Sequence, residues 1–476
     1  MKRLLAFDFG ASSGRAILGE YDNGTLTYQE IHRFDNIPIE QNEHLRWNFT
    51  DLMQNVYKAI EKAGQVDSIG FDTWGVDFGL LDKEGNLLEQ PIHYRDQRTK
   101  HTVQKALQTM DANEIYQATG NQIMNINTLF QMMETDLQGV DKILFMPDLF
   151  AYHLCKTMVC EKSIASTSQM FDLSTGDWSK DILNTYHIPS VFAPLVESGT
   201  VIGEYQGAKV VAVAGHDTQS AIAAMPTQQK DAAFLSCGTW SLFGCELDQP
   251  ILNEQSQQLN LSNEMGANGK VNYLKNITGL WLIQESRRQW QREGQEYSFG
   301  ELAQLAEQSQ PMQCFIDTDA EEFSAPGNLP KRIQEYCQRT GQFVPQTVGE
   351  FSRCIYESLA MKYRETFHQI QKITDKKFSV LHILGGGCQA KLLCQMTADA
   401  LGIQVKAGPV EATALGNLLL QLKALGEVES IDQGRALIER IEPIQEYFPC
   451  NTEQWEKAVP IYEKICKQGG NNNDVS

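Results

Sequence analysis

The chain begins with a short apolar run that breaks into a turn rich in glycine and hydroxyl groups. Leu4–Phe7 has the character of a buried strand, and Asp8–Arg15 follows it with two glycines, two serines and an arginine. Gly10 and Gly14 would allow backbone conformations that a Cβ atom forbids, so that N–H groups and hydroxyls can face one anion. The pattern predicts a strand that leads into a phosphate-binding turn. Asp8, at the strand end, is placed to hold a hydrated Mg²⁺ ion.

The same pattern returns halfway along the chain. Ala232–Leu235 is a second apolar run, and Ser236–Ser241 is a second turn of small and hydroxyl-bearing residues. A single turn of this kind is usually an ordinary hairpin. Its repetition indicates two related lobes, which in a nucleotide enzyme would clamp the β- and γ-phosphates from opposite sides. We expect lobes at residues 1–226 and 227–476, with the junction at residues 225–230.

The length and composition limit the classes of protein to which this chain can belong. A chain of 476 residues suits two or three domains, and strand-like and helical patterns alternate along it, which is typical of an α/β protein. The formal net charge of −20 argues against a nucleic-acid or acidic-membrane partner. No signal-peptide or membrane-spanning pattern occurs, so we expect a cytoplasmic protein. The polar residues 469–474 are expected to fray.

The 11 cysteines are expected to stay reduced in that compartment. No C-x-x-C pair occurs, and the spacing predicts no zinc site, so most of the cysteines should be small core residues. Cys337 and Cys354 could in principle close a loop, and the sequence leaves open whether they ever pair.

Polar side chains gather where two apolar runs end. The first run, with Ile69, Phe71 and Thr73 at period two, leads into Trp74–Gly75 and a following strand at residues 76–80; the second, residues 210–214, ends at Gly215–Thr218. Open α/β sheets bind ligands at the carboxyl ends of their strands. Asp217 is therefore the candidate general base, or else the cap of a helix that begins near Thr218. Trp74 offers an apolar face to an apolar part of a ligand, or is a core residue.

A third glycine-rich turn follows a predicted strand at residues 378–384. Gly385–Gly387 would let a nucleobase or ribose lie across the backbone, although tight packing of strand on helix would explain the glycines equally well. Gly385, Gly387 and Ala390 also fit a variant of the dinucleotide fingerprint. Because the paired hairpins point to a different phosphate-binding architecture, we do not favour a dinucleotide site.

These motifs together resemble the FGGY carbohydrate kinases over nearly the whole chain. The resemblance rests on residues 8–15, 72–78, 216–218, 236–241, 275–284, 385–388 and 407–417. It implies a two-lobed, actin-like (ribonuclease-H-like) ATPase fold with a cleft between the lobes. It also implies that ATP and Mg²⁺ are the cofactors and a small sugar the partner.

By the same resemblance, site residues can be named. The phosphates of ATP would be bound by Ala11, Ser12, Ser13, Gly14, Arg15 and Thr239, the rest of the nucleotide would lie along Gln284 and Gly386, and the sugar would contact Gly75, His216, Asp217, Thr218 and Asn276. Asp217 would be the base and Asp8 the tentative metal residue, acting through water. Arg15 would neutralise developing charge, or else form an ordinary salt bridge. Asp72 and Asp77 receive no catalytic role.

Within the family the resemblance is to members that phosphorylate L-rhamnulose at its 1-hydroxyl, which gives L-rhamnulose 1-phosphate and ADP in L-rhamnose degradation. Residues 214–219 and 167–170 also resemble the corresponding segments of L-fuculose kinases, so that sugar or another ketose is the alternative. A more distant alternative is an actin-like ATPase that is no kinase. The sequence does not fix the oligomeric state, for which we favour a monomer.

Overall fold

The computed structural model describes residues 1–470 and divides into two compact units. Unit 1 contains residues 1–228, 246–274 and 411–442, and unit 2 contains residues 229–245, 275–410 and, within the described chain, 443–470. The first boundary falls inside the predicted junction. The units are not two continuous halves of the chain, because two later segments pack with the N-terminal part.

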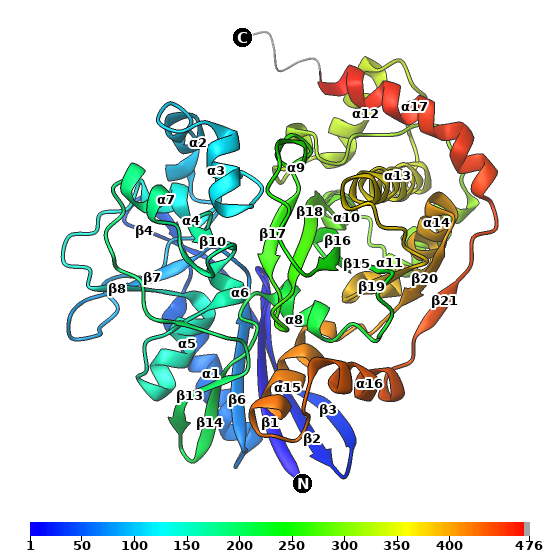
Figure 1. The fold of residues 1–476 in the computed structure, drawn as a ribbon. Helices are drawn as coiled ribbons and strands as arrows, with labels where there is room; N and C mark the ends of the chain where they lie inside the picture. The colour runs from blue at the N-terminus through cyan, green and yellow to red at the C-terminus, as the bar shows by residue number, and fades with distance from the viewer. Residues whose placement is uncertain (471–476) are drawn as a thin grey trace. The chain divides into compact units, whose positions relative to one another are not determined.

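Unit 1 is built on a six-stranded sheet of order β13-β14-β6-β1-β2-β3 (Figure 1). Its elements are β1 (Lys2–Phe9), β2 (Ser13–Asp22), β3 (Thr25–Asp35), β4 (Ile39–Gln41), β5 (His44–Arg46), α1 (Phe49–Ala63), β6 (Ser68–Thr73), β7 (Phe78–Leu81), η1 (Gln97–Thr99), α2 (Thr102–Ala106), α3 (Ala112–Thr119), α4 (Thr128–Met132), β8 (Lys142–Phe145), α5 (Met146–Cys155), β9 (Cys160–Glu161), α6 (Lys162–Ala165), β10 (Phe171–Asp172), β11 (Asp177–Trp178), α7 (Lys180–Thr185), β12 (Leu195–Val196), β13 (Thr200–Tyr205), β14 (Ala208–Ala212), α8 (Asp217–Ala223), α9 (Glu254–Gln258), β17 (Ser262–Met265), α15 (Ala412–Ala424) and α16 (Ile431–Ile441).

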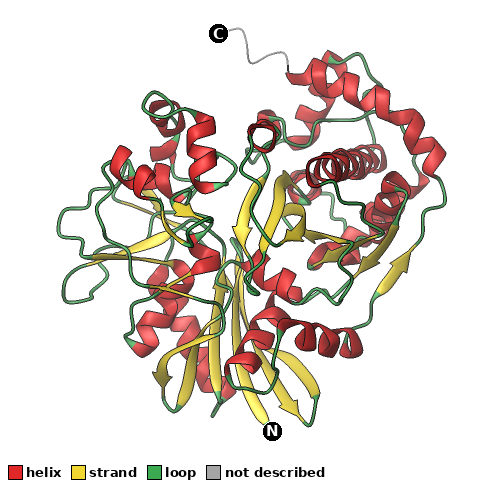
Figure 2. Cartoon of the chain, in the orientation of Figure 1, coloured by secondary structure: helices red, strands yellow, loops and turns green. Residues whose placement is uncertain are grey.

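Unit 2 is built on strands of a second sheet, whose full order is β17-β18-β16-β15-β19-β20-β21. The unit boundaries fall inside β16 (Trp240–Leu247) and β18 (Val271–Thr278). The remaining elements are β15 (Ala232–Cys237), α10 (Trp281–Arg292), α11 (Phe299–Gln308), η2 (Glu321–Phe323), α12 (Leu329–Arg339), α13 (Val348–Thr374), β19 (Val380–Leu384), η3 (Gly386–Gln389), α14 (Lys391–Leu401), β20 (Gln404–Ala407), β21 (Gln445–Tyr447) and α17 (Thr452–Gly470). Helices and strands alternate in both units, which confirms the predicted α/β class (Figure 2).

The first strand shows why the sheet of unit 1 is covered on both faces. Successive side chains of a strand point to opposite faces. In β1, Leu4 and Ala6 join the core formed with α15, whereas Leu5, Phe7 and Phe9 join the core that contains residues of α1 and α5. An apolar run without alternation is therefore what a doubly covered sheet requires. Gly416 of α15 lies so close to α8 that a Cβ atom there would sit 1.8 Å from the carbonyl oxygen of Ser220.

The predicted strands on either side of Trp74–Gly75 both form, but they lie in different sheets, because β6 belongs to the six-stranded sheet and β7 pairs with β8. One local expectation was wrong. Gly469 does not fray but lies in α17, where a Cβ atom would meet the ring of Tyr336, since the helix packs there; residues 471–474 lie outside the described chain. No helix within residues 1–470 is both long and apolar enough to cross a bilayer.

Candidate active site

Three parallel strands of unit 1 end side by side, and acidic residues mark their carboxyl ends. β6 pairs in parallel with both β1 and β14, and its register places Asp72 beside Asp8. Beyond the end of β14, Thr73 forms a bridge with His216, and its N–H donates to the carbonyl oxygen of Gly215 at 2.8 Å. Asp8, Asp72, His216 and Asp217 therefore gather at the edge where open α/β sheets bind ligands.

Asp217 is the first residue of α8 rather than its cap. The N-cap is His216, which makes no side-chain capping bond. Oδ1 of Asp217 accepts hydrogen bonds from the N–H of Thr218 at 2.5 Å and from its hydroxyl at 3.2 Å, and the side chain keeps 34% of its surface exposed. The alternative of a helix-capping aspartate is therefore not what the structure shows. Burial and the nearby charge of Asp8 raise the pKa of the carboxyl against the opposing effect of His216.

A buried glutamate that the sequence analysis missed holds His216. Oε2 of Glu264, in β17, lies 3.1 Å from Nδ1 of His216, whose Nε2 lies 3.4 Å from Oδ1 of Asp217. The same oxygen accepts a hydrogen bond from Nε2 of Gln219 at 2.6 Å, and Gln219 in turn accepts one from Asn272. Burial lowers the pKa of His216, but the hydrogen bond and charge of Glu264, with Asp217, outweigh it and leave that pKa raised.

A second missed glutamate fixes the backbone before Asp217. Glu161, 1% exposed, accepts a hydrogen bond from the N–H of Gly215 at 2.9 Å and one from the hydroxyl of Ser163 at 2.5 Å. That hydroxyl oxygen accepts from the N–H of His216 at 3.4 Å. The loop after β14 is thus held by a carboxylate from a different part of unit 1. No local motif marks either glutamate, because each acts through a partner distant in sequence.

The first hairpin forms as predicted, but its glycines serve another purpose. Among the described residues, neither Gly10 nor Gly14 has a positive φ. A Cβ atom on Gly14 would lie 2.4 Å from the ring of Phe34, so Gly14 is required by packing, whereas the nearest atom to a Cβ on Gly10 would be 3.4 Å away. The side chains of Ala11 and Ser12 are exposed at the tip and that of Ser13 is half-buried, so the turn is accessible to a ligand.

Arg15 lies between two carboxylates. Its Nε and Nη2 donate to Oδ2 of Asp8 at 3.0 and 2.7 Å, and its Nη1 forms an ion pair with Glu411. The alternative of a salt bridge is therefore what this structure shows. It is not an ordinary surface pair, because the side chains are 21%, 10% and 27% exposed and one of them is the candidate metal residue.

Asp72 and Asp77 are both buried but differ in how they are satisfied. Oδ2 of Asp72 accepts from Nδ2 of Asn417 at 2.7 Å, while its Oδ1 has no hydrogen-bond partner; burial, then the charge of Asp8, raises its pKa well above the usual value. Asp77 accepts four hydrogen bonds, two of them from the indoles of Trp47 and Trp74. Burial raises the pKa of Asp77 to about 6. Asp77 thus organises a core in which Trp74 is 6% exposed.

The turn that carries Gly75 is strained. Val76 has φ of +69°, a conformation that β-branched residues rarely adopt. It is held there because its N–H donates to the hydroxyl of Thr167 at 3.2 Å and its carbonyl oxygen accepts from the hydroxyl of Thr128 at 2.7 Å. Such strain persists only where the surroundings enforce it, and it concentrates at ligand sites. A Cβ atom on Gly75 would lie 3.3 Å from Thr167, so space beside this turn is limited.

In unit 2 the second hairpin and the third glycine turn lie at one end of neighbouring strands, since β15 and β19 pair in parallel. Thr239 is exposed at the hairpin tip, and its hydroxyl donates to Oε1 of Gln284 at 3.3 Å. A Cβ atom on Gly387 would lie 2.2 Å from the sulfur of Cys237, whereas one on Gly386 would meet nothing within 4 Å. Gly387 is therefore needed for packing, and Gly386 leaves open space.

Two further sequence expectations have a place in unit 2. Asn276 lies in β18 and is half-buried. The turn after β19 continues into the short 3₁₀ helix η3 before α14 begins at Lys391. A dinucleotide fingerprint needs a long helix that starts at the turn itself, and this connection differs from that arrangement. Thr239 and Gly386 thus follow the carboxyl ends of the neighbouring parallel strands β15 and β19, and Gln284 of α10 contacts Thr239.

Comparison with known sequences assigns both parts of the chain to one family. Residues 3–234 match the N-terminal domain, and residues 233–425 the C-terminal domain, of the FGGY family of carbohydrate kinases. The rhamnulokinase of Bacteroides thetaiotaomicron is 39% identical over 98% of this chain and 99% of its own length. The rhamnulokinases of Bacillus subtilis and Lactiplantibacillus plantarum are each 40% identical, over 93% and 98% of this chain and 95% and 98% of theirs.

Solved structures show the same fold at low sequence identity. A ligand-bound xylulose kinase from Lactobacillus acidophilus is 17% identical, with a TM-score of 0.76 over 98% of both chains. The glycerol kinase of Plasmodium falciparum, solved with ADP, is 15% identical, with a TM-score of 0.75 over 97% of this chain and 98% of that one. The prediction of an α/β, two-domain, actin-like fold is confirmed. With both domains matched and full-length relatives near 40% identity, the chain belongs to the FGGY family of carbohydrate kinases.

Proposed function

We propose that this kinase transfers the γ-phosphate of ATP to the 1-hydroxyl of L-rhamnulose, giving L-rhamnulose 1-phosphate and ADP. The chemistry rests on one observation: the carboxyl of Asp217 stands partly exposed at the strand edge, with a raised pKa and a histidine beside it. The substrate rests on the full-length relatives, which share the name rhamnulokinase. A neutral sugar also suits a chain of net charge −20, since no long-range field opposes its approach.

Asp217 acts as the general base in this proposal. A sugar hydroxyl is a weak nucleophile, and it must lose its proton as the bond to phosphorus forms. Because the pKa of the Asp217 carboxyl is raised, mainly by burial, the carboxylate is a stronger proton acceptor than that of an ordinary aspartate. His216, held by Glu264, fixes the position of the carboxylate and stabilises its charged form. The N–H and the hydroxyl of Thr218 donate to Oδ1 of Asp217. Oδ2 is therefore left as the proton acceptor.

The acidic residues of unit 1 suit a hydrated magnesium ion. Hard oxygen donors are the ligands Mg²⁺ prefers, and the unpartnered buried Oδ1 of Asp72 beside Asp8 fits a site that expects a cation. The carboxylate oxygens of Asp8, Asp72 and Asp217 do not all lie within 4.8 Å of one another, which agrees with coordination through water. When bound, the ion would neutralise charge on the transferred phosphoryl group. Arg15 orients Asp8 and keeps a fixed positive charge at the phosphate turn.

The remaining residues receive their proposed roles from the unit in which each of them lies. In unit 1 the exposed tip at residues 11–14 would bind phosphate through N–H groups and hydroxyls, and Gly75, His216 and Thr218 would contact the sugar. In unit 2 Thr239 would bind phosphate, Gln284 and the open space at Gly386 would receive the nucleotide, and Asn276 would face the sugar. We expect the enzyme to work in the cytoplasm, where ATP is plentiful, and we keep the monomer as its expected state.

The deciding experiment measures ADP release with MgATP and a set of acceptors. The set is L-rhamnulose, L-fuculose, L-ribulose, D-xylulose, glycerol and no sugar. We expect L-rhamnulose to give the highest kcat/KM, almost no ADP without a sugar, and a product whose phosphate is on C1 by phosphorus–proton NMR. A higher kcat/KM for L-fuculose or another ketose would overturn the substrate assignment. Equal ATP turnover with and without sugar would contradict the transfer of phosphate to a sugar hydroxyl.

A further inference from the structure

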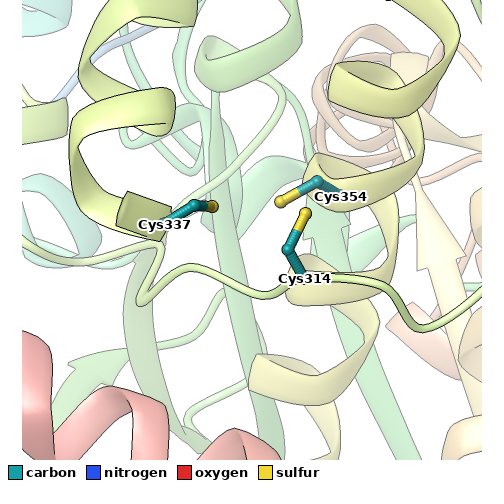
Figure 3. Close-up of side chains that lie close together, drawn as sticks. All are labelled: Cys314, Cys337 and Cys354. Atoms are coloured by element: carbon teal, nitrogen blue, oxygen red, sulfur yellow. The ribbon is translucent and has the colours of Figure 1, made fainter. Parts of the chain in front are cut away.

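Three cysteines from separate segments of unit 2 meet in its core. Cys314 lies in the connection between α11 and η2, Cys337 in α12 and Cys354 in α13. Figure 3 shows their side chains pointing toward one another, and their sulfur atoms all lie within 4.8 Å of each other. They are 3%, 0% and 1% exposed, and all three are free thiols. Within residues 1–470 no other group of three His, Cys, Asp or Glu ligand atoms comes this close together.

The packing of this group differs from that of an ordinary buried cysteine. Most buried cysteines behave as small apolar residues. Here the neighbouring thiols lower the pKa of Cys337 to about 5, while the pKa values of Cys314 and Cys354 are raised. The three thiols therefore influence one another's ionisation. A thiolate is the form of cysteine that binds metal ions.

A small cavity borders two of the three cysteines. Its volume is about 120 Å³, and Cys314 and Cys354 line it together with Gln313, Arg353 and Glu357. This is ample room for a water molecule, and the lining offers the polar partners that a buried water needs. Arg353 and Glu357 form a mostly buried ion pair, with Nε to Oε1 at 2.6 Å. Besides the hydrogen bond with Cys337, the charge of Glu357 within this pair contributes to the raised pKa of Cys314, so a cation bound at the sulfur atoms would also be attracted by that carboxylate.

We propose that Cys314, Cys337 and Cys354 bind a thiophilic divalent cation, Zn²⁺ in the cell, with a water molecule from the cavity as the fourth ligand. Zn²⁺ takes four ligands in a tetrahedral arrangement, so three cysteines leave one position for water, and a Zn–S distance of about 2.3 Å requires sulfur atoms about 3.8 Å apart. The present separations are at most 4.8 Å, so small rotations about χ1 would bring the sulfur atoms to that spacing. Binding releases the protons of the thiols that the ion coordinates.

Such an ion would add a direct link between three parts of unit 2 that are already joined by packing and by hydrogen bonds such as those from the N–H of Ile316 to the hydroxyl of Ser358 and from the N–H of Asp317 to the hydroxyl of Tyr336. It would tie the connection after α11 to α12 and α13, and so stabilise the folded state whenever it is bound. The role is structural and separate from phosphoryl transfer, since none of the three cysteines belongs to the proposed active site. Failure of the metal proposal would therefore leave the kinase proposal untouched.

The test uses the full-length protein, reduced with a phosphine and freed of metal, and titrated with Cd²⁺ as a spectroscopic probe. We expect one Cd²⁺ per chain, a cadmium–thiolate absorption band, release of protons and tighter binding at higher pH. Zn²⁺ should displace the probe and raise Tm. Cys314→Ser and Cys354→Ser should each weaken Cd²⁺ binding by about 100-fold or more. Cys155→Ser and Cys450→Ser, at half-buried and exposed free thiols, are the controls and should bind as the unaltered protein does.

A second readout does not depend on the variants folding. In the unaltered protein, bound Cd²⁺ should protect Cys314, Cys337 and Cys354 from slow alkylation, as mapped by peptide mass spectrometry, while Cys450 reacts with or without the ion. The proposal is overturned if the reduced, folded protein shows no saturable thiolate band. It is also overturned if binding persists in the Cys314→Ser and Cys354→Ser variants, or if the ion protects cysteines other than these three.

Discussion

Replacing Glu264 by glutamine should weaken catalysis through His216 without touching a substrate or nucleotide. Oε2 of Glu264 accepts from Gln219 and lies 3.1 Å from Nδ1 of His216. Glutamine can keep one carbonyl oxygen at that point, so the size and the acceptor survive while the charge is lost. What changes is that a charge-assisted hydrogen bond to the imidazolium becomes a neutral one.

The expected magnitude follows from that difference. Hydrogen bonds to charged groups contribute about 1.5–3 kcal/mol and neutral ones about 0.5–1.5, so the loss is about 1–1.5 kcal/mol. If the whole loss reaches the transition state, kcat falls about five- to twelvefold. The same energy corresponds to a drop of about one unit in the pKa of His216. The alkaline limb of kcat should therefore begin about one pH unit lower.

The direction of the pH effect can be worked out for stability too. Because folding raises the pKa of His216, the stability it contributes is fully present below the ordinary imidazole value of about 6.5 and is lost as pH rises through the folded value. The stability deficit of Glu264→Gln relative to the unaltered enzyme should thus shrink on the alkaline side. Urea unfolding at several pH values measures this.

The assay is kcat across pH at saturating MgATP and sugar, with KM for the sugar recorded at each point. Glu246→Gln is a matched control, because Glu246 pairs with Arg435, whose Nη2 donates to the carbonyl oxygen of Ile222 in α8, away from Asp217. The Glu246→Gln control should be less stable than the unaltered enzyme, but the alkaline limb of its kcat profile should stay at the same pH. An unshifted limb and unchanged kcat in Glu264→Gln would refute the argument that His216 acts as a positioned imidazolium.

Three further changes test the other parts of the site. Asp217→Asn should lower kcat by about 10² to 10⁴ with Tm unchanged by calorimetry, and near-normal turnover would exclude the base role. Gly387→Ala should lower the free energy of unfolding, measured in urea, by about 1–3 kcal/mol, because the new Cβ would meet the sulfur of Cys237. Gly386→Ala should leave the stability unchanged and raise KM for ATP. The opposite result would contradict our interpretation of this turn. Asp8→Asn should raise the Mg²⁺ concentration needed for half-maximal rate in a magnesium titration, and an unchanged requirement would remove Asp8 from the metal site.

Much of the fold could be predicted from sequence because its signals are local. The apolar run of β1, the glycine at position 14 and the run before Gly385 each lie within about ten residues of the turn they specify. The division of the chain into two units was harder to predict from sequence. Residues 246–274 and 411–442 pack with the N-terminal part through contacts such as Asn417 to Asp72, and no local pattern encodes such long-range pairing.

The residues of the candidate site also fall into those that the sequence could predict and those that it could not. His216, Asp217 and Thr218 are neighbours in sequence and follow a clear strand, so their clustering could be predicted from the strand end alone. Glu264 and Glu411 could not be found in this way, because each becomes important only when folding brings it to His216 or Arg15. The role of Gly14 was predicted for the wrong reason. A required glycine can reflect a neighbouring ring rather than backbone freedom, and sequence does not separate the two causes.

The interleaving of the two units has a consequence for synthesis on the ribosome. The chain leaves and re-enters unit 1, whose last segment, residues 411–442, supplies both Glu411 and the helix that buries Asn417 against Asp72. A nascent or prematurely terminated chain that ends before this segment lacks one side of the core beneath its own first strand. Neither unit can therefore be cut out as one continuous gene fragment, and active enzyme is expected only after residue 442 has been translated.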